Sequence, residues 1–215
     1  EYKDDWSMPG KVYAAVLPDD LSGFDEEHQL SLQVIRENML KNHGYYKVTE
    51  DGVEQCLISC DDGVYRFTPP ESEEQDWTVE KLVDEAASDA VLVDLDQDGE
   101  KELILISPFH GEHIYFYKKI DGDYKKVYTY DTADFAHAIY GGTLLGKPAV
   151  IIGHRKGERN LLLFTWEQEK GQYQVEILDR DCGPANVFKY ERGTEEVLIS
   201  TNREIDEVAM YTFEK

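Results

Sequence analysis

The feature that most constrains the fold is an internal repeat of strand patterns. Four short apolar runs end at a small residue, at Ser59, Ser107, Gly153 and Ser200, so their spacings are 48, 46 and 47 residues. Each run is followed by a second apolar and aromatic run, as in Leu161–Phe164. A period of roughly 40 to 50 residues with several strands per unit is typical of β-propeller blades. The repeat therefore predicts an all-β fold built from similar sheets.

We predict a β-propeller of four blades with four strands each, or of five blades if the N-terminal segment forms a degenerate repeat. Residues 45–215 are expected to form the blades, as one compact domain together with residues 1–44. The last unit begins near Ala185 and stops at Lys215 after its third strand. In the second unit the strands are expected at about residues 90–94, 102–107, 113–118 and 124–130.

The N-terminal segment, residues 1–44, has two interpretations. Lys11–Leu17 has a strand pattern that ends at Pro18 and could supply the missing fourth strand of the last blade. Such a ring-closing strand would remove two exposed sheet edges at once. Alternatively, Val12–Leu17 lies about 47 residues before Ser59, which would make this segment a fifth, degenerate blade.

Residues 22–43 show the pattern of an amphipathic helix, with apolar side chains at the spacing of one helix face. Ser22 and Asp25 resemble a capping box at its start, and Gly44 stands where the helix would end. We therefore expect one N-terminal helix in this all-β chain. Its apolar face would consist of Leu30, Val34, Ile35 and Met39.

The charge balance excludes some partners. The chain carries a formal net charge of -23, which argues against nucleic acid or an anionic membrane surface because phosphates would be repelled. No apolar run approaches the roughly 20 residues that a membrane-spanning helix needs. The sequence also lacks GxSxG, P-loop, GxGxxG–helix and HExxH motifs, so no nucleophile with a paired base is indicated.

Three carboxylates stand at alternate positions between two apolar runs, at Asp94, Asp96 and Asp98, and Gly99 follows them. Hard divalent cations, calcium above all, bind such oxygen clusters. The loop is not an EF-hand, because its twelfth position is Leu105 within a β-rich run. It is expected to be a calcium loop between two strands. The candidate ligands are Asp94, Asp96, Asp98, the backbone carbonyl of Glu100, and Glu102.

This loop resembles the FG-GAP/VCBS repeat family, whose blades carry a DxDxDGxxD-type loop between their first two strands. Asp94, Asp96, Asp98 and Gly99 match the pattern, and Glu102 replaces its last aspartate. The resemblance covers only this loop and implies a β-propeller with calcium bound at a blade edge. Corresponding places in the other units lack the acids, so one stabilising calcium ion is implied. The resemblance also favours a secreted or cell-surface protein.

A second group of candidates lies in the turns between the two middle strands of successive units. Equivalent turns in a ring would bring them to one end of the central axis. Arginine offers a planar fork for a carboxylate, phosphate or sulfate, and histidine can act as an acid or base near neutral pH. These candidates are His110, His113, His154, Arg155, Arg159, Asn202 and Arg203. His137, at the start of an inner strand, could face the same channel.

Three functional classes remain open from the sequence. The leading hypothesis is a calcium-stabilised propeller that binds a small anionic or carbohydrate ligand, or a protein partner, at the basic end of its axis. The alternative is a propeller enzyme, a lyase, epimerase or hydrolase acting on an acidic sugar, with His110, His113 or His154 as acid or base. The third is a structural interaction module, in which glutamates of the same turns simply pair with the arginines and histidines.

Overall fold

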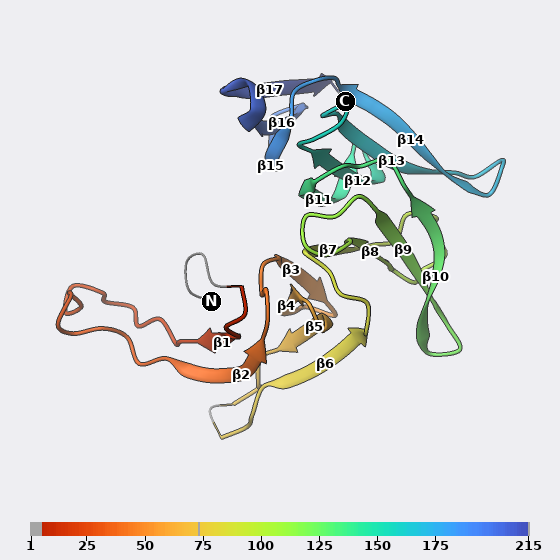
Figure 1. The fold of residues 1–215 in the computed structure, drawn as a ribbon. Helices are drawn as coiled ribbons and strands as arrows, with labels where there is room; N and C mark the ends of the chain where they lie inside the picture. Colours follow the sequence, from red (N-terminus) through yellow and green to blue (C-terminus); the bar gives the residue numbers. More distant parts are fainter. Residues whose placement is uncertain (1–5, 73, 215) are drawn as a thin grey trace.

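The computed structural model describes residues 6–72 and 74–214, and it shows an all-β chain arranged as a four-bladed β-propeller (Figure 1). Blade 1 consists of β3 (Tyr45–Glu50), β4 (Val53–Cys60), β5 (Gly63–Thr68) and β6 (Thr78–Val83). Blade 2 consists of β7 (Asp89–Val93), β8 (Glu102–Ile106), β9 (Ile114–Ile120) and β10 (Asp123–Tyr130). The predicted fold class is therefore confirmed.

The other two blades repeat this antiparallel order from the axis outward. Blade 3 consists of β11 (Ala136–Leu144), β12 (Lys147–His154), β13 (Leu161–Glu167) and β14 (Gln172–Asp179). Blade 4 has three strands, β15 (Pro184–Arg192), β16 (Glu195–Asn202) and β17 (Glu207–Glu214), and the short 3-10 turn η1 (Arg203–Ile205) joins the last two. The strand positions expected in the second unit agree with the structure to within a few residues.

The apolar runs become strands because neighbouring blades cover both of their faces. All five residues of β8 are buried, which explains its continuous rather than alternating apolar sequence. Phe116, on β9, is fully buried in the cluster that joins blades 2 and 3, together with Ile104, Ile152 and Phe164. Burying such side chains is the main favourable contribution to folding.

The inner strands pack against one another in the order β3, β7, β11 and β15, so they line the central axis. Within the described part of the chain no comparable contact joins blade 4 to blade 1, and the blades form an open arc (Figure 1). The prediction that the N-terminal strand completes the last blade is wrong. That strand, β1 (Gly10–Ala14), instead pairs with β2 (Gln33–Met39) in a separate two-stranded sheet.

The predicted N-terminal helix over residues 22–43 is also wrong. Residues 21–32 form turns, in which the Asp25 carboxylate accepts the backbone N–H groups of Glu27 and His28 at 2.9 and 2.8 Å. Such side-chain bonds stabilise a local turn and compete with helix formation. Two apolar residues of β2, Ile35 and Met39, instead pack against blade 1. The apolar residues that showed helical spacing therefore lie partly in this turn region and partly in the strand β2.

Among the described residues the structure contains no helix that is long and apolar enough to cross a membrane. The three cysteines are free thiols, and Cys60 and Cys182 are buried.

Candidate functional site

Three histidines meet near the propeller axis, each from a different blade or its approach. His43 lies just before β3, His110 lies in the loop between β8 and β9, and His137 lies on β11. One ring nitrogen from each lies within 4.8 Å of the others. The His110 and His137 rings are stacked, with centroids 4.6 Å apart, and the His43 ring stands edge-on, 4.7 Å from His110. We call this group the axial histidine cluster.

The backbone around the axial histidine cluster is held in uncommon conformations. His110 and Phe135 have φ angles of +54° and +58°, a region that bulky L-residues rarely adopt. Gly111 has no room for a side chain, because a Cβ there would meet the Ser107 hydroxyl at 2.1 Å. Gly44 lets the His43 segment approach blade 2, because a Cβ there would lie 2.5 Å from the Asp89 carboxylate. Such strain is concentrated where surrounding contacts fix a site.

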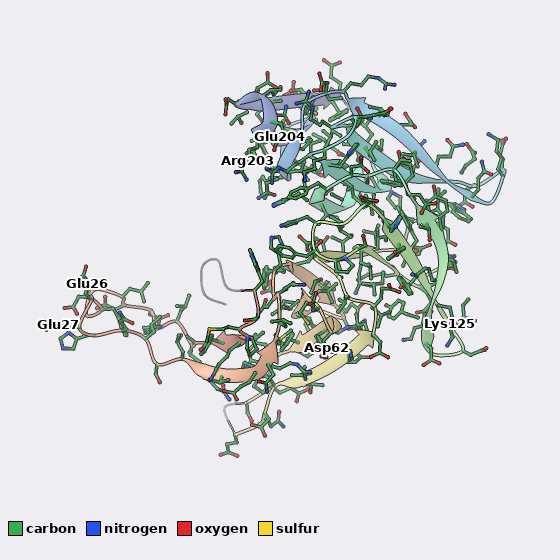
Figure 2. All side chains as sticks on the ribbon, in the orientation of Figure 1. Glu26, Glu27, Asp62, Lys125, Arg203 and Glu204 are labelled. Atoms are coloured by element: carbon green, nitrogen blue, oxygen red, sulfur yellow. The ribbon has the colours of Figure 1, made fainter. Side chains whose placement is uncertain are left out.

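Of the predicted arginines, Arg155 lies beside this cluster and Arg203 lies near it, in the turn after β16. The Arg155 guanidinium lies 4.9 Å from the centroid of the Phe135 ring, and its Nε and Nη2 donate to Glu204 at 2.8 and 2.6 Å. Phe135 in turn stacks near His110, with centroids 4.8 Å apart. Arg203 is next to Glu204 at the same end of blade 4 (Figure 2). We call Arg155 and Arg203 the axial arginine pair.

The histidines and arginines lie close enough to affect one another electrostatically. Burial, followed by the neighbouring His137, His43 and Arg155, lowers the pKa of His110 to about 4. Burial also lowers the pKa of His137, and the charges of Arg155 and Arg203 act in the same direction. His110 and His137 therefore favour the neutral form at pH 7, and the nearby arginines make the local field positive although the whole chain is strongly acidic.

Four of the predicted residues lie outside this site. His154 is buried, accepts the Asn160 backbone N–H at Nε2 (3.1 Å), and has its Nδ1 3.0 Å from the Lys156 carbonyl. Both of its ring nitrogens are thus used within the turn. The remaining three have local partners: His113 lies 3.2 Å from Asp131, Arg159 pairs with Asp181, and buried Asn202 bonds to Ser200 and Glu207.

Sequence reasoning missed His43 and the aromatic residues around it. His43 was assigned to the end of a helix, which concealed its place directly before the first inner strand. The ring of Phe109 lies 5.5 Å from His43 and 4.2 Å from His110, and Trp6 lies 4.7 Å from Phe109. The repeat could have indicated His43, because it stands just before the inner strand β3, much as His137 stands at the start of the inner strand β11.

The predicted calcium loop lies between β7 and β8 and is closed by its own carboxylates. Asp94 accepts the Gly99 N–H at 3.1 Å, and Asp98 accepts the Glu100 N–H at 2.9 Å. The buried Glu102 accepts the Leu95 N–H at 2.7 Å, and burial raises the pKa of Glu102 to about 7.

The structure brings one carboxylate oxygen each from Asp94, Asp96 and Glu102 within 4.8 Å of one another. Asp98 and Glu100 are not part of that group. The Oδ1 atom of Asp94 is buried without a hydrogen-bond partner. An all-oxygen donor set with an unpartnered carboxylate oxygen fits a hard cation such as calcium.

A lysine lies among these carboxylates. The Lys118 ammonium pairs with Asp96 and lies 3.1 Å from Asp98 and 3.6 Å from Glu102. It also lies 5.5 Å from the centroid of the Trp166 ring, which adds a cation–π attraction at the same position. Lys118 therefore offsets part of the negative charge of the loop and would compete with any divalent cation that binds there.

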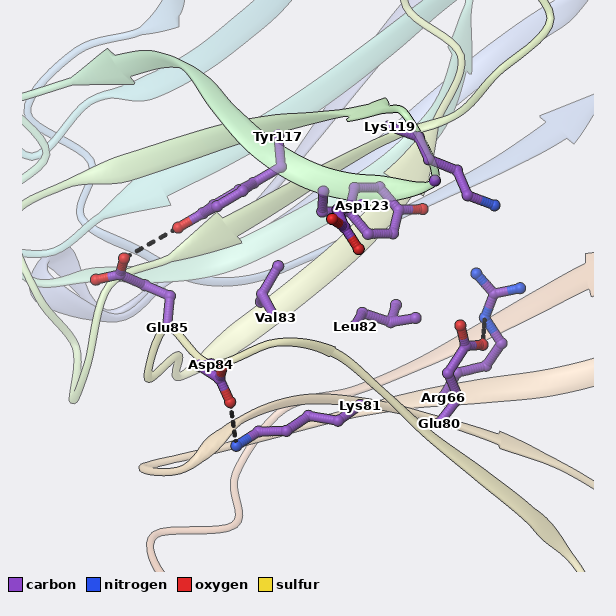
Figure 3. Close-up of a pocket in the computed structure, with 12 residues that line it drawn as sticks. Arg66, Glu80, Lys81, Leu82, Val83, Asp84, Glu85, Tyr117, Lys119 and Asp123 are labelled. Carbon is purple, nitrogen blue, oxygen red and sulfur yellow. Dashed lines mark hydrogen bonds and ion pairs between the residues drawn. The ribbon is translucent and has the colours of Figure 1, made fainter.

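A further hollow of about 540 Å³ lies between the outer strands of blades 1 and 2 (Figure 3). Several of its polar groups already have partners, since Lys81 bonds to Asp84 at 2.6 Å and the Tyr117 hydroxyl donates to Glu85 at 3.0 Å. The hollow is lined by both acidic and basic side chains, so it offers no single sign of charge to a ligand.

The fold and this site together define a β-propeller with a positively charged axial cluster. No protein-family model and no curated protein matches the sequence, so the FG-GAP/VCBS resemblance stays a prediction. Among solved structures, the chain is similar to a protein of Bacteroides fragilis NCTC 9343 described as a candidate 6-phosphogluconolactonase, with a TM-score of 0.54 and 16% identity. The match covers 89% of this chain and 58% of that chain, so this chain spans less than two thirds of its neighbour. At this identity the likeness concerns the fold alone.

Proposed function

We propose that this chain is a β-propeller binding module that takes a small anionic ligand, of the acidic sugar class, at the axial end where its histidines and arginines meet. The observation that carries the proposal is the position of Arg155 against Phe135, which lies beside His110, in a chain of net charge -23. Arg203 lies near enough to His137 to add to the positive field there. A local positive field in an acidic protein selects an anion at that one place. Arginine supplies the planar donors that a carboxylate or phosphate accepts.

Glu204 currently occupies the carboxylate position on Arg155. A ligand carboxylate would take over this pairing, and the aromatic faces of Phe109 and Phe135 beside the cluster would cover the apolar side of a sugar ring. Arg203 is available to the same ligand, because no described carboxylate lies within 4.0 Å of its guanidinium.

The test is calorimetric titration of glucuronate and of 6-phosphogluconate, with glucose as the neutral control. We expect Arg155→Ala and Arg203→Ala each to weaken anion binding about ten-fold or more, because each removes a charge-assisted hydrogen bond. Glu204→Gln should strengthen it, since the competing carboxylate is lost. Arg192→Ala is the matched control, because Arg192 pairs with Glu195 at the opposite end of blade 4. Absence of heat with both anions, in the parent chain and in Glu204→Gln, would overturn the proposal.

The alternative is a propeller enzyme on the same ligand class, and the description of the structural neighbour is consistent with it at the level of fold. Of its three candidate acid–base residues, only His110 belongs to the axial histidine cluster. Its test is turnover of acidic sugar oligomers or lactones by the parent chain and its loss in His110→Ala.

We further propose that the Asp94 loop binds one calcium ion that stabilises blade 2, as its resemblance to FG-GAP/VCBS loops implies. Asp94, Asp96 and Glu102 would hold the ion, and Lys118 would oppose it. We expect Lys118→Gln to raise the calcium affinity about ten-fold or more, because a like charge within about 4 Å of a divalent ion costs at least about 1 kcal/mol per unit charge. Glu102→Gln should lower it.

Calcium titration and the calcium-dependent rise in Tm after chelator treatment measure both effects. Lys125→Gln serves as the control, because Lys125 is exposed and pairs with Asp123 away from the loop. If neither the parent chain nor Lys118→Gln responds to calcium, the calcium proposal fails.

A further inference from the structure

The axial histidine cluster has the geometry of a transition-metal site. Its three ring nitrogens lie within 4.8 Å of one another, from three separate segments of the chain. Zinc bound tetrahedrally by imidazole at about 2.0–2.1 Å requires nitrogens about 3.3 Å apart. The remaining contraction is of the size that rotation of the imidazole rings can supply.

Hydrogen bonds already orient two of these rings. The Nδ1 of His43 lies 3.2 Å from the carbonyl oxygen of Ser88, and the Nδ1 of His137 lies 2.7 Å from that of Ala185. Because a carbonyl oxygen can only accept, Nδ1 is the donor in both rings, which leaves Nε2 to bind a metal in the neutral imidazole. Metal-binding histidines are commonly held in this way, with the second nitrogen donating to a backbone carbonyl.

The third ring supplies an independent observation. The Nδ1 atom of His110 is buried and has no hydrogen-bond partner among the described residues. A buried polar atom without a partner is unfavourable and rare in a folded protein. The loop that carries it is also strained, with His110 at a φ of +54°. A metal ion bound by the His110 ring, through Nδ1 or Nε2, would explain why this side chain is buried without a hydrogen-bond partner at Nδ1.

The donor chemistry selects the class of metal. Neutral imidazole is the form that binds a metal. Imidazole suits zinc, copper, nickel and iron, whereas calcium requires oxygen donors. The axial histidine cluster and the Asp94 loop would therefore select different ions.

We propose that His43, His110 and His137 bind one zinc-class divalent transition-metal ion near the propeller axis, with its fourth position open to water or to an anion. Arg155 and Arg203 disfavour a bare cation nearby but favour an anionic fourth ligand. The metal site goes beyond the proposed anion binding and does not depend on it, because the three imidazoles alone define it.

The test uses the whole chain, stripped of metal by a chelator and then given calcium to occupy the acidic loop. Titration with zinc chloride should show one site with a dissociation constant in the micromolar range or tighter. Cobalt(II) in its place should give the visible absorption of a four-coordinate site with nitrogen ligands. No anionic ligand is added, so failure of the metal proposal and failure of anion binding are separate results.

His43→Ala is the decisive variant, because His43 is exposed and its loss leaves the core packing intact. It should weaken zinc binding at least about 100-fold, since changing even an outer-shell partner of a ligand costs about 10- to 100-fold. His110→Ala should do the same, and its melting temperature without metal shows whether it is folded. His28→Ala, at an exposed histidine distant in sequence from the cluster, should leave binding unchanged. Absence of zinc binding in the parent chain, or unchanged binding in His43→Ala and His110→Ala, would overturn the proposal.

Discussion

Phe116→Ala is expected to destabilise the chain by about 3–5 kcal/mol, the usual cost of emptying a fully buried phenylalanine site. Phe116 has no exposed surface, and its ring centroid lies 4.7, 5.1 and 5.4 Å from those of Tyr173, Tyr128 and Phe164. These contacts join blade 2 to blade 3, so the cavity would weaken the contact between two blades rather than one sheet alone. Chemical denaturation followed by tryptophan fluorescence measures the change.

Phe188→Ala is the matched control for this cavity. Phe188 lies on the inner strand of the last blade with 65% of its surface exposed, so its truncation leaves no cavity. The control should change the free energy of unfolding by less than about 1 kcal/mol. Equal losses in the two variants would contradict the conclusion that blades 2 and 3 share one core.

His154→Ala is expected to cost about 2–4 kcal/mol and to leave anion and zinc binding unchanged. The imidazole bridges two backbone groups of its own turn, and its removal leaves the buried Asn160 N–H and the Lys156 carbonyl without these bonds. Truncation also leaves a cavity at a residue that is 1% exposed. We therefore expect His154 to contribute to stability and not to acid–base chemistry.

The lowered pKa of His154 predicts that the stability of the chain falls as the pH is lowered. Burial lowers the pKa of His154 below its ordinary value of 6.5, so the unfolded chain binds a proton more readily than the folded one. The stabilisation from His154 is therefore complete above pH 6.5 and is lost as the pH falls toward the lowered pKa. The difference in unfolding free energy between the parent chain and His154→Ala should be largest at pH 7–8 and smaller at pH 5.

His28→Ala is the control for this measurement, because His28 is exposed in a turn beside Asp25 and should show little difference at either pH. A stability difference for His154→Ala that stays constant between pH 8 and pH 5 would contradict burial of a neutral imidazole.

The blades could be predicted because their middle strands are buried on both faces. Short continuous apolar runs such as Leu103–Ile106 are typical of strands buried on both faces, and their regular spacing indicates one repeated unit. The acidic loop was equally accessible, because Asp94, Asp96 and Asp98 are close in sequence and Gly99 permits the turn, with a φ of +97°.

The N-terminal segment could not be predicted in the same way. Val34, Ile35 and Met39 fit both a helix face and a strand that packs on blade 1, and only the β1–β2 pairing distinguishes the two. The Asp25 carboxylate can cap a helix or close a turn, and here it closes a turn. Local preferences are weak compared with tertiary packing, so packing decided the outcome.

The candidate site could also be predicted only in part. His110, His137, Arg155 and Arg203 could be proposed from the repeat, because equivalent turns of successive blades meet near one axis. The repeat could not separate these residues from His154, which occupies an equivalent turn but uses both ring nitrogens within it. The direction of a side chain depends on its rotamer and its neighbours, which the spacing of residues does not specify.

The sequence by itself determined the architecture and the acidic loop, because both depend on patterns within about fifty residues of chain. Only the tertiary structure decided that His43, His110 and His137 meet, and that Lys118 lies among the loop carboxylates. The physical reason is that these groups come from segments up to 94 residues apart, from His43 to His137. The distances among the histidines are set by how one blade packs on the next, and the place of Lys118 is set by the pairing of β9 with β8 within blade 2. No local pattern contains that information.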